Sequence, residues 1–244
     1  EVHTCALESF AEAAKLYRLV ITTFPDTDGA RLARLRLAES GVAEGRVLVD
    51  GLASGDARLG DIKLYEELAA GKGPMAQRAK VRIGLWYYWR RDYLKAAEQL
   101  RQVMTKETLP TDLSETCRYA IAESLYRQAK VYYSQGRFSD AVKLYGYWDK
   151  WFEGGQRAEV FYYLAESFRR VHLPEDALNL FVKAQPGPWR EDRRMETLYG
   201  LGLVRLETGD YALAAKTLKE AVDAYPDHPW RSAALSALGK AHYL

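Results

Sequence analysis

Three copies of the triplet Ala-Glu-Ser hold the side chains that could most readily do chemistry. They occupy residues 38–40, 122–124 and 165–167. A glutamic acid held in an apolar site can act as a general acid and protonate a glycosidic oxygen. Three copies in three similar helical segments indicate a shared composition rather than one catalytic site. We therefore predict no catalytic residue in this chain.

Other motifs that could bind a cofactor or a metal are incomplete. The stretch 200–202 has two of the three glycines of a dinucleotide fingerprint, and 71–73 lacks the upstream glycine and the following Ser or Thr of a phosphate loop. Residues 26–29 begin like a calcium loop, but Ala30 replaces the third acidic ligand, so we predict a turn and a helix cap there. No ligand spacing relates the four histidines, which are His3, His172, His228 and His242. The sequence thus predicts no cofactor and no metal.

Composition narrows the remaining classes of function. The chain has 244 residues and a net charge of +2, which gives no electrostatic footprint for nucleic acid. No apolar run approaches the length of a membrane span. Cys5 and Cys117 are far apart and form no CxxC pair, so we expect buried free thiols. A binding protein for another protein or a peptide fits these observations.

A repeated stretch defines the architecture. Gly-Asp-Tyr-Ala-Leu-Ala-Ala at 209–215 recurs in altered form at 91–97, 136–142 and 172–178, each time between two helical segments. In 195–228, Gly202 and Ala214 are small enough to let two helices cross closely, and Pro226 ends the second helix. This pattern resembles the tetratricopeptide repeat (TPR) family. The resemblance implies an all-α fold, a right-handed α-α superhelix of about five to six helical hairpins.

The repeats differ in quality along the chain. Segments 77–110, 122–155 and 158–191 match less fully than 195–228, and residues 111–135 predict one long helix. We expect a single TPR-like solenoid over 1–244, with degenerate, glycine-rich repeats in 1–75 and better-formed repeats in 76–244. Within 41–74 we expect a flexible first half, with a surface loop as the alternative, then a helix over 61–70 that stops at Pro74. The apolar last segment indicates a fragment of a longer protein.

The family resemblance also implies a binding surface. In TPR proteins, certain positions of each first helix face the concave side, and Tyr occupies one of them in three successive repeats of this chain. A row of tyrosines offers broad contact area at low entropy cost. The alternative is that the rings only pack against the neighbouring repeat. The predicted partner-binding residues are Arg78, Tyr88, Trp89, Tyr126, Lys130, Tyr133, Tyr162, Glu166, Arg169, Arg170 and Tyr199.

Two aromatic-Pro-Asp joints, at 24–26 and 225–227, point to a narrower group. They resemble the repeats of bacterial envelope proteins, such as BamD-type assembly lipoproteins and Tol-Pal-associated periplasmic coordinators. The resemblance implies a non-catalytic scaffold in the periplasm or at the cell envelope, with the cytoplasm as the alternative. The alternative function is a helical accessory or docking domain of a larger enzyme or secretion machine.

Overall fold

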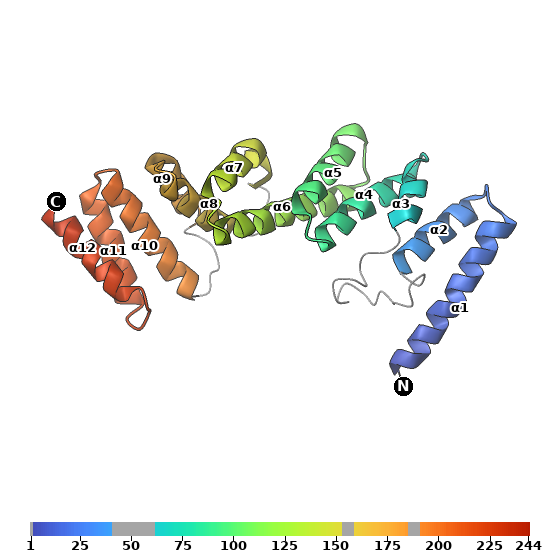
Figure 1. Ribbon diagram of the computed structural model, residues 1–244, viewed down its shortest axis with the longest axis horizontal. Coiled ribbons are helices and arrows are strands. Elements are labelled where there is room, and N and C mark those ends of the chain that lie inside the picture. Colours follow the sequence, from blue (N-terminus) through green and yellow to red (C-terminus); the bar gives the residue numbers. More distant parts are fainter. Residues whose placement is uncertain (1, 41–61, 153–158, 185–190) are drawn as a thin grey trace. The chain divides into compact units, whose positions relative to one another are not determined.

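The computed structural model describes residues 2–40, 62–152, 159–184 and 191–244. Within these residues the regular elements are all α-helices (Figure 1). Their bounds are α1 Val2–Thr23, α2 Asp28–Ser40, α3 Ile62–Ala69, α4 Pro74–Trp89, α5 Tyr93–Lys106, α6 Thr111–Ser134, α7 Phe138–Phe152, α8 Glu159–Arg170, α9 Pro174–Ala184, α10 Glu191–Glu207, α11 Tyr211–Ala224 and α12 Arg231–Tyr243. The predicted all-α fold of TPR-like hairpins is confirmed.

The chain forms two compact units, Glu1–Ser124 and Leu125–Leu244. The division between them falls inside α6. The predicted single solenoid, with its change of repeat quality near residue 75, stays a prediction.

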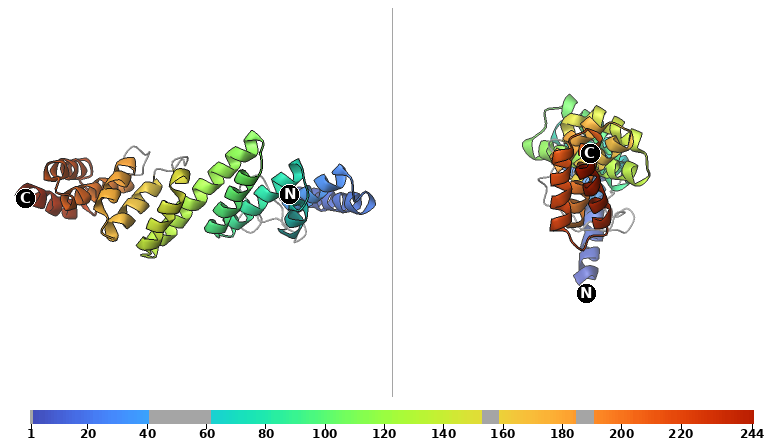
Figure 2. Two further views of the ribbon diagram at one scale, coloured as in Figure 1. Left: turned by 90° about the horizontal axis from the view of Figure 1, so that it is seen from above. Right: turned by 90° about the vertical axis from the view of Figure 1, so that its left-hand side faces the viewer.

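Helices that follow one another in the chain pack as hairpins in both units. In the first unit, α1 packs on α2, α3 on α4 and α4 on α5; in the second, α8 packs on α9, and α10, α11 and α12 lie side by side (Figures 1 and 2). Leu35 of α2, Leu68 of α3 and Ile83 of α4 share one apolar core. In the second unit, α12 contributes Ala234 and Ala237 to the core that it shares with α10 and α11. Each hairpin therefore buries its apolar stripe against its neighbours in sequence.

The four copies of the repeated stretch form four turns of the same geometry. Each begins with a residue in the left-handed region, with φ of 64° at Arg91, 70° at Gly136, 61° at His172 and 81° at Gly209. In each turn this residue donates its N–H to the carbonyl three residues back, and the next residue donates to the carbonyl five residues back. This pair of hydrogen bonds is the Schellman motif, which satisfies the last carbonyls of a helix. The sequence repeat therefore encodes a repeated helix stop.

Glycines allow α4 and α10 to approach their partner helices. A Cβ atom added to Gly84 would lie 2.5 Å from the side chain of Leu100 in α5, and one added to Gly202 would lie 2.5 Å from Leu218 in α11. One added to Gly200 would lie 2.5 Å from the Phe181 ring of α9. The two glycines at 200 and 202 therefore allow close packing on two sides of α10. This packing accounts for both glycines without a dinucleotide-binding motif.

Several local predictions are confirmed and one is wrong. Thr27 accepts a hydrogen bond from the N–H of Ala30 at 3.2 Å and so caps α2, as predicted. The predicted long helix over 111–135 is α6. Pro74 does not end α3; it begins α4, where a proline loses nothing because the first helical N–H has no partner within the helix. The glycine-rich part of 41–61 lies outside the described residues.

Candidate functional site

The first unit contains three of the predicted binding residues, all on α4. Arg78 is exposed, whereas Tyr88 and Trp89 are half-buried and their rings meet edge to face at 4.9 Å. The Tyr88 hydroxyl donates a hydrogen bond of 3.4 Å to Glu123. Tyr88 and Trp89 are thus partly used in packing within this unit, while Arg78 is open to solvent.

The second unit buries two tyrosines of the predicted row. Tyr126 and Tyr162 are only 4% and 2% exposed. The Tyr126 hydroxyl donates to Glu159 at 3.0 Å, and burial raises the pKa of Tyr162 well above its usual value. Both rings lie inside the unit and pack against neighbouring repeats, the alternative that the sequence left open.

An arginine of α10 covers the rings of α8. The Arg193 guanidinium lies 4.7 Å from the ring centroid of Tyr162 and 5.2 Å from that of Tyr163. It also forms ion pairs with Glu196 and, at 3.8 Å, with Glu159. Stacking on two rings and pairing with two carboxylates suits a planar guanidinium. Sequence reasoning missed Arg193, and its only local signal is the Arg193-Glu196 spacing on one helix face.

The predicted residues at the end of α8 form an ion-pair group. Arg169 makes a bidentate contact with buried Glu166, at 2.7 and 2.9 Å, and also donates to Glu207 of α10 at 3.1 Å. Arg170 donates to the same Glu166 carboxylate at 2.9 Å. The hydrogen bonds that Arg169 donates to Glu166 raise the pKa of the Arg169 guanidinium above its usual value. Glu166 is therefore a buried partner for two arginines, and Arg170, with half its side chain exposed, is the member most open to solvent.

Lys130 and Tyr133 lie on the side of α6 that faces the Tyr162 and Tyr163 rings of α8. Lys130 is exposed, with its Nζ 5.9 Å from the Tyr163 ring centroid. Tyr133 is half-buried and meets Tyr162 and Tyr163 at centroid distances of 6.1 and 5.2 Å. The structure thus brings together most of the residues predicted from α6 and α8, in an arrangement whose charges are largely paired.

A groove is open on the part of α10 that faces α12. It lies between α10 and α12, has a volume of about 380 Å³, and includes the predicted residue Tyr199. Tyr199 is half-buried and meets Trp230 edge to face at 5.5 Å. We name it the α10–α12 groove; its lining is Tyr199, Leu203, Leu206, Glu207, Ala233, Ser236, Ala237 and Lys240. The four residues from α10 occupy positions that the TPR resemblance assigns to the concave side. The four residues from α12 were not predicted.

The Ala-Glu-Ser triplets act in the structure as helix residues. Ser124 and Ser167 are buried, and each hydroxyl donates at 2.6 Å to the carbonyl four residues back. Among the described residues, no group of three or more His, Cys, Asp or Glu could hold a metal, and no helix is long and apolar enough to cross a membrane. Cys117 is a buried free thiol, and burial raises its pKa to about 11, so it is a weak nucleophile at neutral pH. The side chain of Cys5 lies outside the described residues.

Comparison with known proteins identifies the repeat. A sequence profile of the tetratricopeptide repeat matches residues 123–146 and 196–228. These two segments match the repeat that the sequence resembles, and together they cover less than half of the chain. The matched residues include parts of α6 and α7 and parts of α10 and α11, and α10 and α11 pack against each other. Among curated proteins, none matches this chain significantly.

Solved structures with a similar fold include three repeat proteins. YrrB, described as a TPR protein with an unusual peptide-binding site, is 15% identical with a TM-score of 0.45, and the match covers 92% of this chain and 98% of that one. A putative kinesin light chain of Podosopora anserina is 19% identical with a TM-score of 0.40, covering 69% and 85%. The TPR2AB domain of yeast Sti1, in complex with pHSP90, is 16% identical with a TM-score of 0.39, covering 96% and 92%. These likenesses concern the fold alone.

Proposed function

We propose that this chain is a non-catalytic interaction scaffold that binds a peptide segment of a partner protein in the α10–α12 groove. The observation that carries the proposal is the groove itself. Its volume of about 380 Å³ is at the lower end of the range for ligand pockets in proteins, enough for one or two anchoring side chains. No catalytic role is part of this proposal.

The lining of the groove suits a peptide. Leu203 and Leu206 supply apolar surface, while Glu207 and Lys240 place opposite charges along it. Such a surface can bury an apolar anchor and orient the rest of the segment through charged groups at the rim. Ala233 and Ser236 of α12 are exposed and small, so a peptide in the groove can reach the α10 side chains beside them.

The remaining predicted residues are arranged around internal pairs. Tyr126, Tyr162 and Glu166 are buried, so in this structure they support the repeats and do not offer surface to a partner. Arg170 and Lys130 are exposed and extend the proposed binding surface along α8 and α6. In the first unit, Arg78 is exposed in the same way, and the half-buried Tyr88 and Trp89 lie on the same helix.

Blocking the groove tests the proposal. Peptides selected from a random phage-displayed library against the whole chain are measured on Ser236→Arg and Ala233→Arg, each of which puts a long side chain into the groove from an exposed position. We expect at least about a tenfold loss of affinity, because the anchor side chain loses its pocket. Leu235→Arg is the matched control, since Leu235 is 46% exposed on α12 and does not line the groove.

Two outcomes contradict the proposal. One is that no peptide is selected; the other is that the selected peptides bind Ser236→Arg and Leu235→Arg equally well. Circular dichroism of each variant shows whether its helices remain intact.

The setting in a bacterial envelope complex is a further part of the proposal. It is supported by the two aromatic-Pro-Asp joints, which have the same hydrogen bonds: Phe24 and Tyr225 each donate to the carbonyl four residues back, and the residue three further on donates to their own carbonyls. Fractionation of the native cells tests it, because recovery in the cytoplasm would contradict it. The alternative, an accessory domain of a larger enzyme or secretion machine, is tested by the sequence of the full gene.

A further inference from the structure

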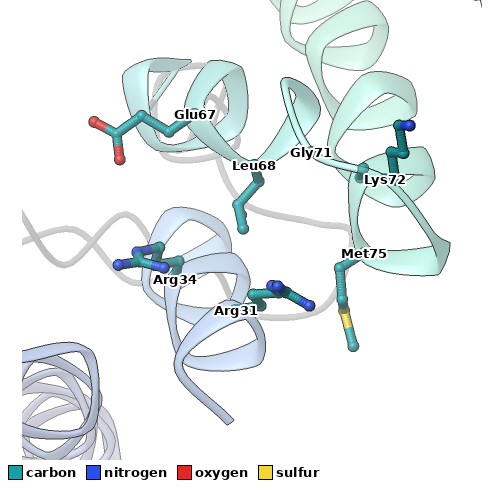
Figure 3. Close-up of a pocket in the computed structure, with 8 residues that line it drawn as sticks. Arg31, Arg34, Glu67, Leu68, Gly71, Lys72 and Met75 are labelled. Carbon is teal, nitrogen blue, oxygen red and sulfur yellow. The ribbon is translucent and has the colours of Figure 1, made fainter. Parts of the chain in front are cut away.

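A second pocket lies in the first unit, where α2, α3 and the start of α4 meet. It has a volume of about 420 Å³. Arg31 and Arg34 project from α2, Glu67 and Leu68 come from α3, and Lys72 and Met75 come from the turn and first residues of α4 (Figure 3). We name it the basic pocket; its lining is Arg31, Arg34, Glu67, Leu68, Gly71, Lys72, Met75 and Ala76.

Short side chains keep the pocket open. The turn between α3 and α4 contains Gly71 and Gly73, and Gly73 has a φ of 89°, which a residue with a side chain adopts only under strain. The floor is apolar: Leu68 is buried in the core with Leu35, and Met75 packs against that core while partly exposed. A ligand in this pocket therefore meets an apolar base below a charged rim.

The rim carries three cations and one carboxylate. Arg31 is about half exposed, and its ion pair at 2.9 Å is with Asp28, whose side chain is 96% exposed. An ion pair so open to water contributes little, so it competes weakly with a ligand carboxylate. Arg34 donates a hydrogen bond of 3.2 Å to the carbonyl of Pro25. This bond uses only one of the five N–H donors of the guanidinium. Lys72 and Glu67 are exposed.

The local backbone adds to this positive potential. Met75 and Ala76, which line the pocket, are in the first turn of α4, where helical N–H groups have no partner within the helix. No side chain caps this turn, since its N-cap residue is Gly73. The positive end of the helix dipole therefore acts in the same direction as Arg31, Arg34 and Lys72.

We propose that the basic pocket binds an acidic segment of a partner polypeptide. Asp or Glu carboxylates of that segment pair with Arg31 and Arg34, and an apolar side chain between them packs on Leu68 and Met75. The charge of the lining selects this partner, because the single carboxylate of Glu67 leaves a net excess of two positive charges. This site is separate from the α10–α12 groove, so either can fail without the other.

Three labelled peptides of equal length test the charge requirement. They alternate Leu with Glu, with Gln or with Lys, and their binding to the whole chain is followed by fluorescence polarisation at low and at physiological salt. We expect the Glu peptide to bind at least about tenfold more tightly than the Gln peptide, with weaker binding as salt increases. Equal binding of the Glu and Gln peptides would overturn the proposal.

Paired variants test the location. Arg31→Gln with Arg34→Gln is expected to weaken binding of the Glu peptide at least about tenfold, whereas Arg18→Gln with Arg118→Gln, an equal change of charge at exposed positions, leaves it within about twofold. Lys72→Glu, at an exposed turn position, should also weaken binding of the Glu peptide, independently of the two arginines. Equal effects of the two double variants would show binding to net charge alone and contradict the proposal.

Methionine methyl groups report the occupied site directly. The chain has three methionines, of which only Met75 lines the basic pocket, while Met195 is fully buried in the second unit. In ¹³C-methyl spectra, the Glu peptide should shift the Met75 signal and leave those of Met104 and Met195 unchanged, and Ser236→Arg should not alter this result. A phosphoserine peptide that binds more than about tenfold tighter than the Glu peptide would replace the carboxylate partner with a phosphorylated one.

Discussion

The interface of α8 with α10 and that of α10 with α12 use the same repeat positions for different purposes. In the first, Arg193 covers Tyr162 and pairs with Glu159 and Glu196, so the space over the tyrosine is filled. In the second, Trp230 meets Tyr199 edge to face, and small residues of α12 leave a groove beside it. The difference shows that the following helix decides whether a repeat tyrosine is covered or borders an open groove.

Truncating the two tyrosines should give the largest contrast. Tyr162→Ala removes a ring that is 2% exposed and should lower the free energy of unfolding by about 3–5 kcal/mol. Tyr199→Ala, at a half-buried ring, should cost less than half as much but weaken peptide binding. Urea unfolding followed by circular dichroism measures the first effect. Similar losses of stability in both variants would remove the distinction between the two interfaces.

Removing Arg193 should have the next largest effect. Arg193→Ala leaves Glu159 and Glu196 without their shared cation and uncovers two rings, so we expect a loss of about 2–3 kcal/mol. Arg193→Lys should recover only part of it, because an ammonium group cannot stack as a plane. The exposed neighbour Arg194→Ala is the control and should change stability by less than about 0.5 kcal/mol. Full recovery by lysine would show that charge alone matters at this position.

Crowding α10 against α11 tests whether both interfaces depend on the placement of α10. Gly202→Ala puts a Cβ 2.5 Å from Leu218, and we expect a net loss of about 1–2 kcal/mol. Gly239→Ala on α12 meets open space and should instead stabilise its helix by up to about 1 kcal/mol. Thermal unfolding compares the two variants. If both stabilise the protein, the close crossing at Gly202 imposes no constraint.

Substitutions in the turns after α8 and α10 should change the free energy of unfolding least, and with opposite signs. His172 has a φ of 61°, so His172→Gly relieves left-handed strain and should raise the free energy of unfolding by about 0.5–1 kcal/mol. Gly209→Ala, at a φ of 81°, should lower it by about 1 kcal/mol. Paired urea titrations resolve changes of this size. Equal signs for the two variants would mean that the turns are not equivalent.

Local chemistry explains what the sequence could predict. The turn at Gly209, the cap at Thr27 and the close approach at Gly202 depend on residues within one hairpin, and these predictions are confirmed. The fold class followed from them, because each hairpin repeats the same signals. Pro74 was misassigned because a proline is compatible with both the end of one helix and the start of the next.

The exposure of the predicted site residues depends on distant parts of the sequence. Tyr162 and Tyr199 occupy the same repeat position, but the side chains that meet them, Arg193 and Trp230, are about thirty residues further on. No local pattern around either tyrosine contains that information. The basic pocket was missed for a similar reason, since α2 and the turn between α3 and α4 supply its cations from segments separated by about forty residues.

The placement of small residues on α12 has a consequence for how binding specificity could change. Ala233 and Ser236 face the α10–α12 groove and are exposed, whereas Ala234 and Ala241 of the same helix are buried in the core. Substitutions at the first pair can therefore alter the shape and charge of the groove while the packing of the second pair is preserved. One face of a single helix could be diversified, in evolution or in the laboratory, to recognise new peptides on an unchanged scaffold.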